Sequence, residues 1–240
     1  MRPYVRKERK LHLFKEQEII ESFFYVKSQL EKMIEEENVI VLFVGTSPHL
    51  SEIVKQAAIS CQSPYLANYW PGGFLTNFRT IRQQIKHLKD LLYFQKSEKF
   101  ASLSKKRQAE LEKEITKLKE VYEGVLDLLK YDCLFTSPRE EKRSKILLFI
   151  IGLKKEKTAL KEAKSLNIPV IAICNTDGDP DLIDYLILGN DYTESSVAFL
   201  IDKVAEIIRE SKLKKDAGLS TEKAAVAAAN EEKVLSTEAH

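Results

Sequence analysis

The segment Asn175–Asp181 (NTDGDPD) holds the residues whose types and spacing come nearest to a metal site. Asp177, Asp179 and Asp181 alternate directly after an apolar stretch, and carboxylates at the carboxyl end of a parallel strand can bind a hard cation. The glutamate that would close an EF-hand calcium loop is absent at the required spacing, and a turn in which Asp and Asn bond their own backbone explains the same composition. We favour the turn. The alternative hypothesis is an α/β enzyme with an acidic metal-binding crevice at the carboxyl ends of its strands, where Asp177 and Asp179 bind the metal.

The other residue types that do chemistry lack the spacing that a catalytic or cofactor site needs. The segment Phe43–His49 (FVGTSPH) has a single glycine, so it matches neither the phosphate loop nor the dinucleotide fingerprint, and Gly45 fits a tight turn between strand and helix. The four histidines show no metal-ligand spacing, and the three cysteines are few and far apart, which indicates a reducing compartment without a disulfide framework. These patterns give little support to a nucleotide, zinc or catalytic site, and we expect no catalytic residue, metal, cofactor or small-molecule substrate.

The segment Asn68–Thr80 (NYWPGGFLTNFRT) has the most unusual composition in the chain. It contains the only tryptophan, a Pro-Gly-Gly turn, and Thr76 or Asn77 as a possible helix cap. Immediately afterwards, basic residues spaced 3, 4 and 3 apart place one cationic stripe along the following helix: Arg79, Arg82, Lys86 and Lys89. A helix start beside a cationic stripe suits the phosphate backbone of a structured RNA better than a small substrate.

The charges are segregated along the chain, although the net charge of the 240 residues is only +2. Residues 1–15 carry six basic side chains and one acidic, residues 79–107 carry nine and two, and residues 175–206 carry one basic and eight acidic. Basic stretches attract phosphate backbones through counterion release, although an ordinary solvated helix face explains such a run equally well. No apolar run approaches the roughly 20 residues of a membrane-spanning helix, so we expect no membrane partner. The RNA-binding residues that the pattern predicts are Arg2, Arg6, Lys7, Arg9, Lys10, Trp70, Asn77, Arg79, Arg82, Lys86 and Lys89.

Five short apolar runs predict the strands of one sheet, at residues 39–44, 64–67, 146–151, 169–173 and 185–188. The first expected helix runs to about Ser60 from a cap at Thr46 or Ser47, with Pro48 in its first position. A second helix is expected at residues 155–166, and a last one follows the strands at about 193–210. Strands that alternate with helices of this length specify an α/β fold, doubly wound (flavodoxin/Rossmann-like) with a mainly parallel sheet.

The middle of the chain departs from this alternation. Apolar residues at heptad spacing, from Phe78 to Leu92 and from Leu111 to Leu129, flank a polar stretch, which predicts an inserted antiparallel coiled-coil helical hairpin. Two core helices of the main domain are the alternative. We expect a discontinuous α/β domain at 1–77 and 131–210, the hairpin at 78–130, and a flexible tail at 211–240 that is disordered or loosely helical. Residues 136–145 are expected to form a surface insertion.

These motifs together resemble the small-subunit ribosomal protein S2 family, in its bacterial or organellar form, over residues 1–209. The matching blocks are LFVGT (42–46), the W-x-G-G-x-L-T-N-F pattern at Trp70–Phe78, EKTALKEA (156–163), NIPV (167–170), NTDGDPDLIDY (175–185) and GND (189–191). The resemblance implies an α/β domain with an inserted hairpin. It also implies a structural, non-enzymatic role in translation, with small-subunit rRNA and neighbouring ribosomal proteins as partners.

The sequence also departs from the family pattern. The G-x-H-x-G-H element that usually precedes the stretch at Met1–Tyr4 is missing, Tyr69 stands where Arg is common, Gly152 replaces an Asp, and the 136–145 insertion is atypical. The shortened start and the divergent tail favour the ribosome of an organelle, the mitochondrion ahead of the plastid, over a bacterial cytoplasm.

Overall fold

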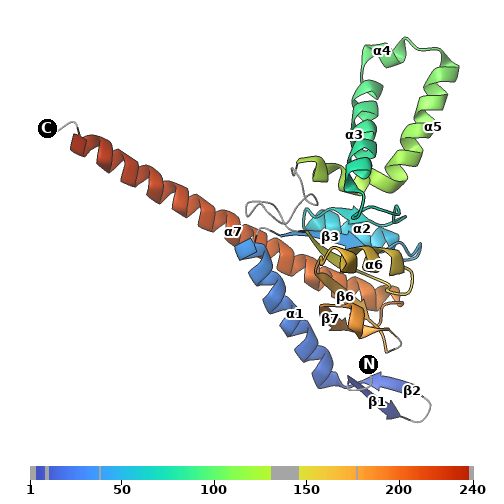
Figure 1. Ribbon diagram of the computed structural model, residues 1–240, viewed down its shortest axis with the longest axis vertical. Coiled ribbons are helices and arrows are strands. Elements are labelled where there is room, and N and C mark those ends of the chain that lie inside the picture. The colour runs from blue at the N-terminus through green and yellow to red at the C-terminus, as the bar shows by residue number, and fades with distance from the viewer. Residues whose placement is uncertain (1–3, 9–10, 38, 131–145, 177, 238–240) are drawn as a thin grey trace.

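A five-stranded parallel sheet forms the centre of the protein in the computed structural model, which describes residues 4–8, 11–37, 39–130, 146–176 and 178–237 (Figure 1). The strands lie in the order β4-β3-β5-β6-β7, which is the flavodoxin-like order. Their bounds are Ile40–Val44 (β3), Tyr65–Leu66 (β4), Ile146–Ile150 (β5), Val170–Cys174 (β6) and Tyr185–Leu188 (β7). Every position of β3, β5 and β6 is buried, because helices cover both faces of the sheet. The predicted doubly wound α/β fold and its five strands are confirmed.

Two apolar clusters cover the two faces of the sheet. One cluster joins alternate strand residues such as Phe43 and Phe149, whose rings meet edge to face at 5.2 Å, to helices α1 (Glu16–Glu37), α2 (Ser51–Ser60) and α7 (Glu194–Thr237). The other joins the opposite strand face to α6 (Lys157–Ser165), to the loop that contains Trp70, and to the start of α3 (Phe78–Gln95). The Trp70 loop is thus part of the second core.

The predicted helical hairpin is present and projects from the sheet domain (Figure 1). Helix α3 leads through α4 (Glu98–Ala101) to α5 (Lys105–Tyr122), and the 3-10 helix η2 (Glu123–Lys130) returns the chain to the body. The heptad seam is buried at Ile81, Ile85 and Leu88 of α3 and at Leu111 and Ile115 of α5. Within the described residues, no helix is both long enough and apolar enough to cross a lipid bilayer.

The start of the chain contains elements that the sequence analysis did not predict. Strands β1 (Val5–Glu8) and β2 (Leu11–Phe14) pair antiparallel, and α1 follows them. Helix α2 begins at Ser51 rather than at Pro48, and Leu50 occupies its cap without a side-chain hydrogen bond. The predicted cap at Thr46 or Ser47 is wrong because Thr46 donates to Glu156 instead.

Helix α7 continues past the end that was expected near residue 210 and runs to Thr237. Ser211 is fully buried, Lys212 Nζ donates to the carbonyls of Cys61 and Gln62 at 2.8 and 2.9 Å, and Lys215 Nζ donates to the carbonyl of Ile34 at 2.8 Å. These ammonium groups meet the carboxyl ends of α2 and α1, where helix dipoles favour cations. The expected flexible tail therefore begins as a packed helix, and the division into domains stays a prediction.

The cysteines that the structure describes act as small apolar residues. Cys61 and Cys174 are buried, one in each core cluster. Burial raises the pKa of the Cys61 thiol, so it stays protonated. Cys133 and the 136–145 insertion lie outside the described residues.

Candidate nucleic-acid interface

The basic stripe predicted on α3 lies beside the buried face of that helix. Because Phe78, Ile81, Ile85 and Leu88 are buried, the rotation of α3 about its axis is fixed, and Arg79 and Lys86 are exposed while Arg82 and Lys89 are half-buried. Across the part of the chain that the structure describes, Arg79, Lys86 and Lys89 have no carboxylate partner; Arg82 makes an interaction within the chain. Arg79, Lys86 and Lys89 therefore present positive charge that is not neutralised by ion pairs within the described residues.

Glu114 of α5 contacts α3 at His87, outside the basic stripe. His87 Nε2 lies 2.9 Å from Glu114 Oε1, which identifies the flank that faces α5. Successive helical residues point about 100° apart, so Lys86 and the rest of the stripe lie on a different flank from His87. The stripe therefore lies on a different flank of α3 from His87, and Arg79 and Lys86 are exposed to solvent there.

Trp70 and Asn77 lie outside the stripe, Trp70 buried in the loop before α3 and Asn77 at the start of the helix. The Trp70 side chain is only 7% exposed and its ring packs 5.1 Å from that of Phe74, so it has no open face on which a base could stack. Trp70 therefore packs inside the loop, and its role as an RNA contact stays a prediction. Asn77 is exposed at the cap position of α3, as predicted, but its side-chain oxygen accepts from the Thr80 hydroxyl rather than from the helix backbone.

The basic start of the chain lies apart from the stripe. Arg6 and Lys7 are in β1, opposite Leu13 and His12 of β2, and this strand pair lies at the far end of the molecule from the hairpin (Figure 1). Three further predicted contacts lie outside the described residues: Arg2, Arg9 and Lys10. The structure therefore separates the two basic groups that the sequence predicted.

A buried glutamate that the sequence analysis missed organises the Trp70 loop. Glu162 of α6 is 9% exposed, and its Oε1 accepts from the indole Nε1 of Trp70 at 3.1 Å and from the Gly73 amide at 2.8 Å. Its Oε2 accepts from the amides of Leu75 and Thr76 at 2.9 and 3.4 Å and from the Thr76 hydroxyl at 3.5 Å. Both oxygens of one carboxylate thus hold the loop that leads into α3.

A second buried glutamate closes the edge of the sheet where doubly wound enzymes place their ligands. That place is the crevice between the carboxyl ends of β3 and β5, where the strand order reverses. Here Glu156, 2% exposed, accepts from the Thr46 amide at 2.7 Å and from the Thr46 hydroxyl at 2.6 Å. A Cβ on Gly45 would lie 2.9 Å from Val54 Cγ2, so the turn after β3 is packed against α2. The Glu156 carboxylate thus bridges the two loops at this crevice.

The acidic segment after β6 forms a turn, as favoured from the sequence. The Asp179 carboxylate accepts from the Asp181 amide at 3.1 Å and starts the short helix η3 (Pro180–Leu182), and Asp184 accepts from the Val170 amide at 2.9 Å. Asp177 lies outside the described residues, and among those that are described no three His, Cys, Asp or Glu side chains gather as metal ligands.

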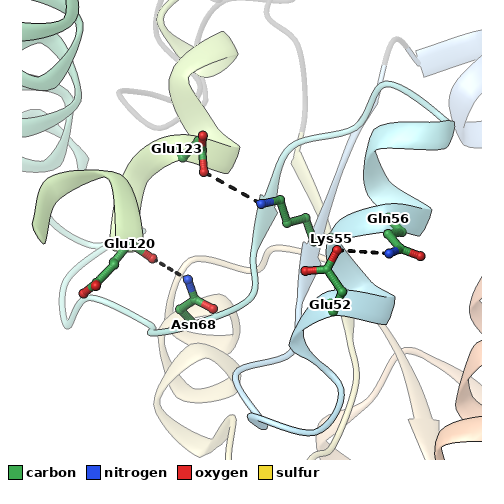
Figure 2. A network of polar contacts seen from close by, with 6 residues as sticks. All are labelled: Glu52, Lys55, Gln56, Asn68, Glu120 and Glu123. Carbon is green, nitrogen blue, oxygen red and sulfur yellow. Dashed lines mark hydrogen bonds and ion pairs between the residues drawn. The ribbon is translucent and has the colours of Figure 1, made fainter. Parts of the chain in front are cut away.

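Polar contacts join the carboxyl-terminal end of the hairpin, where α5 passes into η2, to the α/β body (Figure 2). Asn68 Nδ2 donates to the Glu120 carbonyl at 2.9 Å, and Lys55 Nζ of α2 lies 3.9 Å from Glu123 Oε2. A small polar cleft of about 130 Å³ lies between these elements. Beside it, Gly124 packs so closely on Tyr65 of β4 that no side chain fits between them.

We predict that Gly124→Ala destabilises the protein by about 1–3 kcal/mol, because the added Cβ would overlap the carbonyl oxygen and ring of Tyr65 and force the hairpin root away from β4. Urea unfolding followed by circular dichroism measures the change. Gly72→Ala is the matched control, since a Cβ there meets nothing within 4 Å. Equal stability of the two variants would contradict the proposed packing.

Comparison with known proteins identifies the family. The family model described as ribosomal protein S2 matches residues 1–211. The small ribosomal subunit protein uS2 of Coprothermobacter proteolyticus is 36% identical over 216 residues, covering 88% of this chain and 74% of that protein. The protein of the same name from Petrotoga mobilis is 36% identical over 213 residues, covering 88% of this chain and 69% of that protein. The chain therefore belongs to the ribosomal protein S2 family, whose members are structural, non-enzymatic components of the small ribosomal subunit.

Proposed function

We propose that this protein is a structural constituent of the small ribosomal subunit that binds rRNA through the basic stripe of α3. The observation that carries the proposal is the stripe itself: Arg79, Lys86 and Lys89 follow one flank of a helix whose other face is buried, without carboxylate partners among the described residues. Cations at fixed spacing release counterions when they bind phosphates, without any need for base recognition.

The other predicted contacts are assigned by their position. Asn77 is exposed at the start of α3, whereas Trp70 supports the loop from inside. The basic residues near the start of the chain form a second RNA contact at a distance from the first. Neighbouring small-subunit proteins are the remaining partners.

We also propose that the ribosome is that of an organelle, the mitochondrion ahead of the plastid. The described part of the chain diverges from the family pattern at Tyr69, 58% exposed, where Arg is common, and at Gly152 after β5, where Asp is common. Both relatives named above are bacterial, and the fractionation described next tests the organelle.

The test of the proposed function is sucrose-gradient sedimentation of mitochondrial, plastid and cytosolic extracts, probed for this chain. We expect the chain to migrate with small subunits, to stay with them when EDTA separates the subunits, and to come from the mitochondrial fraction. A chain that remains at the top of every gradient would overturn the ribosomal role. Migration with small subunits in the cytosolic extract alone would overturn only the proposal that the ribosome is that of an organelle.

A further inference from the structure

We propose that Glu162 is a positioning residue: it fixes the first helix of the hairpin on the α/β body and so sets the direction of the basic stripe. The inference rests on the proposed function only in its last step, from the direction of the stripe to binding of the small subunit.

The carboxylate of Glu162 connects two segments that are far apart in the chain. Glu162 belongs to α6, which packs on the sheet, and its partners belong to the loop between Trp70 and Thr76. The two oxygens accept hydrogen bonds from four N–H groups, of which the shortest are those of Gly73 at 2.8 Å and Leu75 at 2.9 Å. A negative charge is the form that best accepts several N–H bonds at once, so the loop is shaped around an anion that the protein itself supplies.

The same loop determines where α3 begins. Asn77 occupies the cap position of the helix directly after Thr76. The aromatic rings continue from the loop into the helix, with Phe74 5.1 Å from Trp70 and 5.9 Å from Phe78. The amides bound by Glu162 lie just before the amino end of α3, where the helix dipole also favours an anion. Movement of the loop would therefore move the axis of α3, and the stripe with it.

The test compares Glu162→Gln and Glu162→Asp with Glu112→Gln, a matched control on α5 with the same change of group at an exposed position. Glutamine keeps the length of the side chain but replaces one acceptor oxygen by an NH2 group, which faces the amide donors of the loop. Aspartate keeps the carboxylate, but its side chain is one methylene shorter and holds the carboxylate farther from the loop. Pulsed EPR measures the distance between nitroxides at Tyr93→Cys on the hairpin and Phe199→Cys on α7, both exposed sites, in a Cys133→Ser background. Cys61 and Cys174 remain, because they are buried. Emission of Trp70, the only tryptophan, reports the loop directly.

We expect one narrow distance for wild type and Glu112→Gln, a broad or shifted distribution for Glu162→Gln, and an intermediate one for Glu162→Asp. If about a tenth of the Glu162→Gln molecules keep the hairpin docked, binding to the small subunit weakens about tenfold. A wild-type distribution in Glu162→Gln would overturn the proposal. If that variant does not fold, a wild-type distribution in folded Glu162→Asp would overturn it equally. The two proposals can fail separately. If the distance distribution broadens in Glu162→Gln but the wild-type protein does not bind small subunits, the proposed function is overturned and the positioning role of Glu162 remains.

Discussion

Reversing the charges of Arg79, Lys86 and Lys89 to glutamate is expected to weaken binding of the full chain to small-subunit rRNA by at least about 100-fold at 0.15 M salt. Each phosphate contact contributes about one unit to the slope of log K against log salt, and reversal adds repulsion to the loss of the contact. Arg82 is left unchanged because it makes an interaction within the chain. Filter binding between 50 and 300 mM KCl is expected to show a slope about 2–3 units less steep than wild type.

The matched control reverses three exposed cations of α5 that have no ion pair within the described residues: Lys105, Lys113 and Lys117. Both triple variants change the net charge equally, so a difference between them measures position rather than total charge. Exposed substitutions away from packed groups alter stability by about 0.5 kcal/mol or less each, and circular dichroism verifies that both variants fold. Equal loss of binding in the two variants would show that the stripe on α3 is not the contact.

The sheet and the hairpin could be predicted from the sequence because their signals are local. Strands such as β3 and β5 are continuous apolar runs because both faces of the sheet are covered. The apolar heptad positions of α3 and α5 predict a hairpin because each helix can bury its seam against the other. Helix α1 was missed although its signal was present: Phe23, Val26, Leu30 and Ile34 are spaced 3, 4 and 4 apart and pack in the first core cluster.

The carboxylates that organise the site could not be predicted, because their partners are distant in the chain. Glu162 and Trp70 are separated by 92 positions, and Glu156 and Thr46 by 110. In the sequence both glutamates lie among lysines, which indicates a solvated helix face. Only the fold shows that they are buried. For the same reason the sequence could not show that the indole N–H of Trp70 donates to Glu162.

Removal of the second buried carboxylate, by Glu156→Ala, is expected to cost about 3 kcal/mol of the free energy of unfolding. Two hydrogen bonds to a charged acceptor are lost, and the Thr46 amide is left without that acceptor at a half-buried position. For a chain of this size the loss corresponds to a melting temperature about 6–12 °C lower. Glu156→Gln keeps an oxygen acceptor and is expected to lose about 1 kcal/mol.

The reason for so large an effect is the position of this contact in the sheet. The Thr46–Glu156 contact bridges the loops after β3 and β5, the point where doubly wound enzymes leave a crevice for a ligand. In this protein a side chain of the chain itself takes that place, so the site stabilises the fold rather than binding a substrate. A double-mutant cycle with Thr46→Val separates the hydrogen bond of the Thr46 hydroxyl from that of the Thr46 amide. We expect the hydroxyl to contribute about half of the stabilisation that Glu156 provides through the two bonds. Glu156→Ala and Glu156→Gln variants as stable as wild type would contradict this argument and reopen the crevice as a candidate ligand site.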